Sequence, residues 1–288
     1  MAFVSHGARV GVRVSDASVL ALIGERLPPG ARPATSPVVD DLYSLVVGVD
    51  EPGSIMRRYN MLYVGSTRLA RSFDLGEVLT ALQTDMEYTV AMGARRRLFV
   101  EAGVVAWRGR ALIVLGSSGS LPVSLIAALV HAGATYCASR YAVLDTRGRV
   151  HPFPTTVSST AGDDTTRAVA HSFSDMIGRQ PLPVGAIVVA EQRPGARFSA
   201  RPLSRGQGVL ALLERAVAAA DRPALALRVA DAAAAAASAV LRVRFDDASD
   251  AAMPLLAAAD RRRHAHLGGA SHATAGPERA SDFAQRRG

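Results

Sequence analysis

An apolar strand, a glycine-rich turn and an apolar helix follow one another between residues 111 and 132, and this succession constrains the fold more than any other feature. The strand reads ALIVLG, the turn GSSGS and the helix LPVSLIAALV. A strand that is apolar on both faces is typical of a parallel sheet covered by helices. A second continuous apolar run, VGAIVVAEQ, indicates another buried strand. The sequence therefore predicts an α/β fold.

The turn has the layout of a phosphate-binding loop, G-x-x-x-x-G-K-[ST], but it lacks the residues that make such a loop work. Counting from Gly116, Leu121 falls at the second glycine and Pro122 at the lysine. Val123 falls at the hydroxyl position, with Ser124 just after it. Leucine obstructs close approach of the backbone to phosphate, proline has no N–H to donate, and valine cannot ligate a metal. The loop is therefore degenerate.

The candidate nucleotide-binding residues are those of this degenerate loop: Gly116, Ser117, Ser118, Gly119, Ser120, Leu121, Pro122, Val123 and Ser124. A structural explanation accounts for the same residues without a ligand. Ser120 can cap the helix, and proline is tolerated in a first helical turn, where its N–H would have no partner in any case. The motif by itself leaves both explanations open.

The chain contains no lysine, so all 33 basic residues are arginine. This composition excludes Schiff-base chemistry and a phosphate-binding lysine. Half of the formal charge of +8 lies in residues 261–288, where six arginines outnumber two acids, so we expect a solvated tail and no nucleic-acid surface. One cysteine excludes an internal disulfide. With no membrane span, metal cluster or signal-peptide pattern, we expect a cytoplasmic protein.

The composition along the chain suggests three parts. Residues 1–90 predict a small α+β lobe, residues 91–263 the α/β domain, and residues 264–288 a disordered basic tail. Within the first lobe, strands are expected at 8–14, 41–49 and 60–73, and helices at 17–27 and 75–92, the latter with Leu79, Leu82 and Met86 on one face. A hairpin turning at 146–148, a long polar loop at 155–182 and a helix capped by Ser204 are expected farther on.

Two long segments resemble the HPr kinase-like family of bacterial serine kinases, whose catalytic domain is related to HPr kinase/phosphorylase and to phosphoenolpyruvate carboxykinases. The first runs from Phe99 to Pro154 (FVEAGVVAWRGRALIVLGSSGS…YAVLDTRGRVHPFP), and the second is VGAIVVAEQRPGARFSARPLSRGQGVLALLERAV. The resemblance covers roughly residues 98–220. It implies a P-loop-kinase-like sheet flanked by helices, with ATP and Mg²⁺ as cofactors if the protein is active.

The chain departs from this family at three functional places. In the loop, residues 121–124 (LPVS) replace the family's glycine-lysine-serine/threonine run. Arg140 replaces the acid of a Ser-Asp pair, and Glu101 replaces a histidine. Because the resemblance is combined with these losses, it implies a pseudokinase that acts as a regulatory partner of a protein or peptide. The resemblance is also compatible with a homo-oligomer. The alternative is an active ATP-dependent serine kinase that phosphorylates a small protein or a ribosomally made peptide through a rewired, lysine-free site.

For the rewired site the catalytic candidates are Asp145, Glu101 and Arg140. Arg140 could bind phosphate with two parallel hydrogen bonds, and Asp145, Glu101 or the Asp163–Asp164 pair could supply a general base or a Mg²⁺ ligand. Each also has an ordinary explanation. Asp145 fits a turn, the Asp163–Asp164 pair a polar loop and Arg140 a solvated strand.

Overall fold

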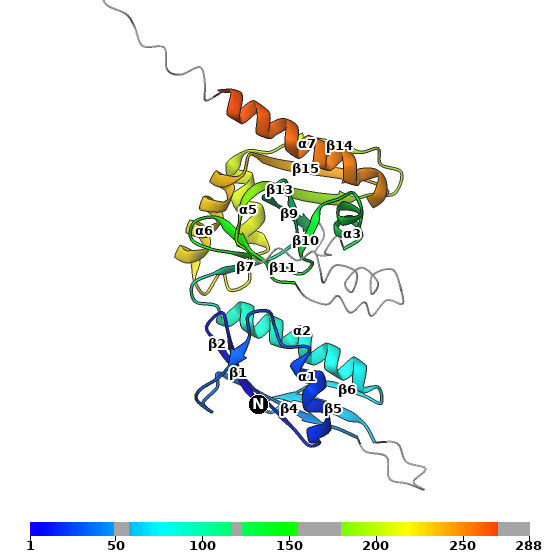
Figure 1. Cartoon of the computed structure of the whole chain (residues 1–288), viewed down its shortest axis with the longest axis vertical. Helices are drawn as coiled ribbons and strands as arrows, with labels where there is room; N and C mark the ends of the chain where they lie inside the picture. Colours follow the sequence, from blue (N-terminus) through cyan, green and yellow to red (C-terminus); the bar gives the residue numbers. More distant parts are fainter. Residues whose placement is uncertain (49–57, 117–122, 155–179, 270–288) are drawn as a thin grey trace, which may run out of the picture.

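The computed structural model describes residues 1–48, 58–116, 123–154 and 180–269, with the backbone alone in 261–269. A small sheet with one long helix forms the N-terminal lobe, and a larger sheet with helices on both faces forms the second lobe (Figure 1). The expectation of a mixed α/β protein is thereby confirmed. The expected polar loop falls mostly in 155–179, and the last nineteen residues of the expected tail are 270–288, so both lie outside the described residues.

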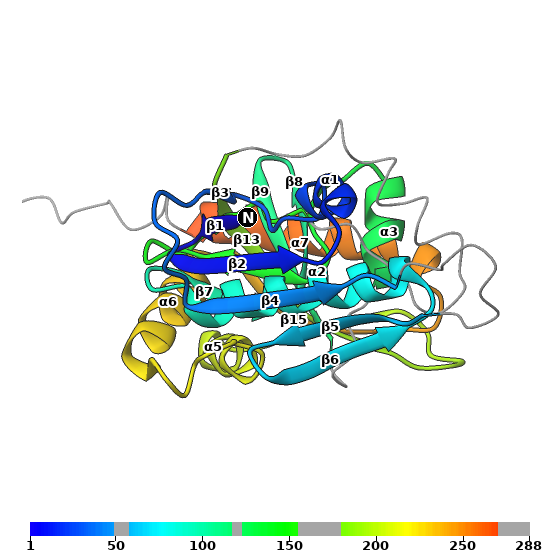
Figure 2. The same cartoon turned by 90° about the horizontal axis from the view of Figure 1, so that it is seen from below.

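The small sheet has the strand order β3-β1-β2-β4-β5-β6. Its strands are β1 (Ala2–Ser5), β2 (Ala8–Val14), β3 (Arg32–Pro33), β4 (Asp41–Val46), β5 (Asn60–Val64) and β6 (Thr67–Ser72). Strands β2 and β4 are parallel, and the other neighbours are antiparallel. Figure 2 shows β2, β4, β5 and β6 side by side with α2 behind them.

Helix α2 (Leu75–Gly93) covers one face of this sheet. It begins at Asp74, whose carboxylate accepts a hydrogen bond from Gly76 N at 2.7 Å. Leu79, Leu82 and Met86 are buried, which confirms the predicted apolar face. The helix predicted at 17–27 was too long: a 3-10 turn (Ala17–Val19) leads into α1 (Leu20–Gly24), and two prolines follow at 28 and 29, which have no N–H to extend it.

The larger sheet has nine strands: β7 (Leu98–Glu101), β8 (Gly103–Trp107), β9 (Arg110–Gly116), β10 (Thr135–Ala138), β11 (Tyr141–Leu144), β12 (Arg149–His151), β13 (Leu182–Gln192), β14 (Ser199–Pro202) and β15 (Ala239–Phe245). The strand order is β10-β8-β9-β13-β12-β11-β7, and β15 lies between β13 and β14. Strands β9, β13 and β15 are parallel. Strands β11 and β12 form the predicted hairpin.

Helices cover both faces of the parallel strands. Helices α3 (Val123–His131) and α7 (Ala248–Gly269) pack on one face, and α5 (Arg205–Glu214) and α6 (Pro223–Ala236) on the other (Figure 1). The central part of strand β13 is buried at five positions between Val184 and Ala190, as its apolar run predicts. Ser204 caps α5 as expected: its hydroxyl accepts from Gln207 N, and the Gln207 side chain accepts from Ser204 N.

The two lobes share one hydrophobic core. It joins Phe3 and Met86 of the first lobe to Phe99, Tyr141 and Phe153 of the second. The His6 ring of the first lobe also lies 5.2 Å from the Phe99 ring, edge to face. The lobes therefore pack as one folded body.

Helix α7 is described as far as Gly269, so residues 264–269, which we expected to be disordered, are helical. Arginine, alanine and leucine all favour a helix. Within the four described segments, no helix has the length and apolar character needed to cross a membrane.

Candidate functional site

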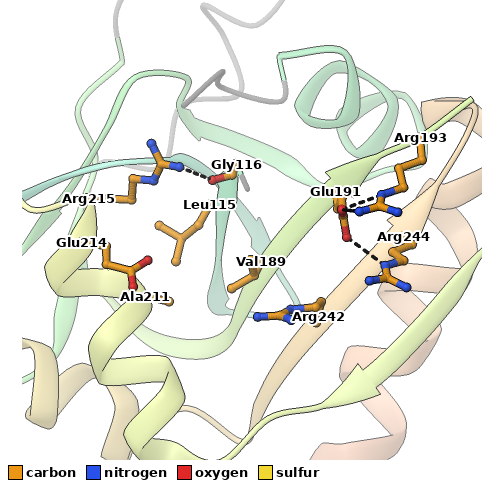
Figure 3. Close-up of a pocket in the computed structure, with 10 residues that line it drawn as sticks. All are labelled: Leu115, Gly116, Val189, Glu191, Arg193, Ala211, Glu214, Arg215, Arg242 and Arg244. Atoms are coloured by element: carbon orange, nitrogen blue, oxygen red, sulfur yellow. Dashed lines mark hydrogen bonds and ion pairs between the residues drawn. The ribbon is translucent and has the colours of Figure 1, made fainter. Parts of the chain in front are cut away.

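A basic pocket lies at the edge of the larger sheet where the parallel strands β9, β13 and β15 end. In parallel α/β sheets ligands bind outside the carboxyl ends of the strands, because loops and helix termini meet there. The pocket holds about 340 Å³ and opens beside α5. Its lining is Leu115, Gly116, Val189, Glu191, Arg193, Ala211, Glu214, Arg215, Arg242 and Arg244 (Figure 3).

Strand alternation decides which side chains reach the pocket. In β15, Leu241, Val243 and Phe245 are buried against α3 and α7. Successive side chains point to opposite faces of a strand, so Arg242 and Arg244 face the α5 side. Val189 and Glu191 of β13 share that face by the same rule. The register places Glu191 directly beside Arg244.

Glu191 holds two of the arginines in place. One of its oxygens accepts a hydrogen bond from Arg193 Nε at 2.6 Å and the other from Arg244 Nε at 2.8 Å (Figure 3). The hydrogen bonds from Arg244 and Arg193 lower the pKa of Glu191 from its ordinary value, against the opposing effect of desolvation. Glu191 is therefore an anion at neutral pH that orients both guanidinium groups.

Arg215 follows the last residue of α5 and fixes that helix to β9. Its Nη2 donates to Gly116 O at 3.0 Å (Figure 3). Gly116 is the last residue of β9 and the first residue of the predicted phosphate loop. The end of α5 is thereby held against the strand that carries the loop.

Arg193 and Arg242 are the exposed arginines of the pocket, and the side chain of Arg242 extends over the pocket floor toward α5 (Figure 3). Among the described residues its guanidinium group has no hydrogen bond or ion pair. Glu214 extends into the pocket from α5, on the side opposite Arg242 (Figure 3). Four arginines against two glutamates give the lining a formal charge of +2. Such a site attracts anions, and guanidinium groups bind phosphate and carboxylate with paired hydrogen bonds.

The structure describes only part of the predicted loop. Gly116 ends β9, and Val123 and Ser124 begin α3. The six residues between them, Ser117, Ser118, Gly119, Ser120, Leu121 and Pro122, lie outside the described residues. Nucleotide binding by this loop remains a prediction, and of the three loop residues that the structure describes Gly116 lines the pocket.

Asp145 lies in the turn between β11 and β12, and its carboxylate is fully engaged there. It accepts from Arg147 N at 2.9 Å and Arg149 N at 3.0 Å, and it bonds the Arg149 side chain and His151 Nε2. Desolvation raises the pKa of Asp145, but the hydrogen bonds from His151, Arg149 and Arg147 outweigh it and hold the pKa well below its usual range. These contacts are those of a turn-stabilising aspartate.

Glu101 and Arg140 are not part of the pocket lining. Glu101 ends β7 with an exposed side chain, and its N–H donates to Arg215 O at 2.9 Å. Arg140 lies between β10 and β11, 4.0 Å from the Glu87 carboxylate of α2 and 5.5 Å above the Tyr141 ring. Neither lines the pocket, nor does Asp145, so the three candidates do not form one site with it. The Asp163–Asp164 pair lies outside the described residues. Among the residues that are described, no cluster of metal-ligating side chains is present.

Sequence reasoning missed five charged residues of the pocket: Glu191, Glu214, Arg215, Arg242 and Arg244. One signal was available, because the LRVRF run places two arginines on one face of a strand whose other face is apolar. The remaining members come together through strand register and helix packing.

No family model matches this chain, and no curated protein matches it. Among solved structures it is similar to the HPr(Ser) kinase/phosphatase from Coxiella burnetii, with 8% identical residues and a TM-score of 0.29, over 59% of this chain and 99% of that one. A similarity this distant assigns neither a family nor an activity to the chain.

Proposed function

We propose that this chain is a catalytically impaired, HPr kinase-like protein that binds a protein or peptide partner through an anionic group of that partner. The pocket of four arginines at the carboxyl edge of β9, β13 and β15 is the observation that supports the proposal. Its formal charge favours an anion, and two of its arginines are pre-oriented by Glu191. Pre-orientation reduces the entropy that a ligand must overcome on binding.

The same residues argue for binding rather than phosphoryl transfer. Catalysis of that step requires Mg²⁺ and cations around the transferring phosphate. The described residues of the pocket lining include two carboxylates. Glu191 is held by Arg193 and Arg244, so Glu214 is the one of the two that remains for Mg²⁺. The loop has proline in place of its lysine. An active, rewired kinase is the alternative that the experiment must test.

Calorimetry with Mg·ATP on the purified chain tests the catalytic side of the proposal. We expect no binding heat for the wild type, and binding by a restored-loop variant that carries Leu121→Gly, Pro122→Lys and Val123→Ser. Wild-type binding in the micromolar range, together with transfer of phosphate to a peptide, would overturn the proposal and favour the active kinase.

Peptide binding tests the other side. Peptide arrays that carry anionic and neutral residues at a central position should retain the chain through the anionic peptides. The double variant Arg242→Ala/Arg244→Ala should weaken that binding at least tenfold, whereas the matched control Arg228→Gln, an exposed arginine of α6 outside the pocket, should leave it unchanged. Equal retention of neutral and anionic peptides would contradict the proposal.

A further inference from the structure

Arg201 of the edge strand β14 extends the basic surface of the pocket, because it lies next to Arg242. The antiparallel register of β14 and β15 places Arg201 directly opposite Arg242. Side chains at directly opposite positions lie on the same face of the sheet. Because the neighbours of Arg242 in β15 are buried against α3 and α7, Arg201 and Arg242 both lie on the α5 side, beside the pocket.

This placement is unfavourable for the folded chain alone. Like charges at directly opposite positions destabilise an antiparallel pair. Both arginines are exposed, and within the described part of the chain neither guanidinium group has a hydrogen bond or ion pair. The adjacent position on the same face differs: Ser199 stands opposite Arg244, and Glu191 neutralises that arginine. Among the described residues, the guanidinium groups of Arg201 and Arg242 thus remain available to a ligand, whereas that of Arg244 is bonded to Glu191.

We propose that Arg201 and Arg242 together bind a phosphate monoester carried by the partner peptide, as on a phosphorylated serine. This inference rests on the proposed function and specifies its ligand. A phosphate monoester near pH 7 has close to two negative charges and three acceptor oxygens, so it can engage both guanidinium groups at once. A carboxylate has one charge and two oxygens, which one guanidinium group satisfies. The subsite therefore selects phosphate over carboxylate.

The position of the pair favours a phosphate on a larger partner. Both arginines are exposed at the edge of the sheet, where β14 has β15 as its neighbour. Arg193, with 58% of its side chain exposed, lines the same pocket as Arg242. An anionic group presented on a peptide can reach an open surface of this kind, and the flanking residues of the peptide can contact the rest of the pocket.

The test uses three peptide arrays with randomised flanks and a central phosphoserine, glutamate or serine. We expect the full chain to bind phosphoserine peptides at least about tenfold more tightly than glutamate peptides, as one additional charge-assisted hydrogen bond would give. Phosphoserine binding should also strengthen as pH rises from 5 to 7.5, since the second phosphate ionisation lies near pH 6. Glutamate binding should change far less over that range.

Variants separate the pair from the rest of the pocket. Arg201→Gln and Arg242→Gln should each lower phosphoserine affinity to the level of glutamate and flatten the pH profile, and Arg228→Gln should do neither. Thermal unfolding checks their folding, because loss of one like charge should leave stability equal or higher. Equal binding of phosphoserine and glutamate, or an unchanged preference in Arg201→Gln, would overturn this inference and leave the proposed function standing. If neither anionic peptide binds, both fail.

Discussion

Glu87 is a buried carboxyl group at the junction of the two lobes, and its removal should stabilise the protein at alkaline pH. It lies on α2 with a residue exposure of 3%. Gln83 Nε2 donates to one carboxylate oxygen at 3.0 Å, and Arg140 of the second lobe lies 4.0 Å from the other. Burial raises the pKa of Glu87 from 4.5 to about 7, although the Gln83 hydrogen bond and the charge of Arg140 oppose the change.

The size of the effect follows from the difference between the folded and unfolded proton affinities. Each tenfold change in affinity corresponds to about 1.4 kcal/mol. A pKa of about 7 in place of 4.5 therefore costs the folded state about 3 kcal/mol once the group is ionised in both states. Because the folded state binds the proton more tightly, stability falls as pH rises from 4.5 through 7, and the full cost is present at pH 8.

The variant Glu87→Gln removes the charge and keeps the size of the side chain. We expect its free energy of unfolding to exceed that of the wild type by up to about 3 kcal/mol at pH 8, and the difference to vanish toward pH 4.5. Urea unfolding followed by circular dichroism from pH 5 to 8.5 measures this difference. The control Glu25→Gln changes an exposed carboxyl group and should show a flat difference. A Glu87→Gln protein that is no more stable than the wild type at pH 8 would refute the reasoning.

Two further predictions concern backbone geometry. In the β11–β12 turn Gly148 has φ of +68°, and an added Cβ would lie 2.5 Å from Ala232 O, so Gly148→Ala should lower the free energy of unfolding by at least about 2 kcal/mol. Gly109 has φ of +76°, but an added Cβ there would contact no other atom, so Gly109→Ala tests the backbone strain alone and should lower the free energy of unfolding less. Equal losses of stability in the two variants would contradict the steric argument. Ser204→Ala removes the α5 cap and should cost about 1 kcal/mol in urea unfolding, with Ser204→Asn recovering most of it. No difference between these two variants would argue against the cap.

Local patterns predicted most of the elements, because burial imposes periods of 2 and 3.6 on strands and helices. Strands β9 and β13 follow from their apolar runs, and α2 from its apolar face. The patterns missed β14, whose four residues include arginine and proline and carry no apolar alternation. A strand of this kind is defined by its pairing with β15, which is a tertiary contact.

The candidate site was less predictable from the sequence than the fold. Asp145 is a residue type suited to catalysis, but the sequence around it is that of a turn, and its carboxylate stabilises that turn. The charged residues of the pocket come from β13, β15 and the end of α5, and they share no local motif.

The sequence alone determined that any anion site in this chain that uses a lysine-type or arginine-type cation must use arginine, since lysine is absent. It also determined that the 111–116 strand lies inside a sheet, because an apolar run gains free energy from burial wherever the chain folds. The tertiary structure decided which charged residues lie side by side. The register of neighbouring strands places Glu191 beside Arg244 and Arg201 opposite Arg242. Register depends on the packing of the whole sheet against its helices, and a slip of one residue would turn these arginines into the core.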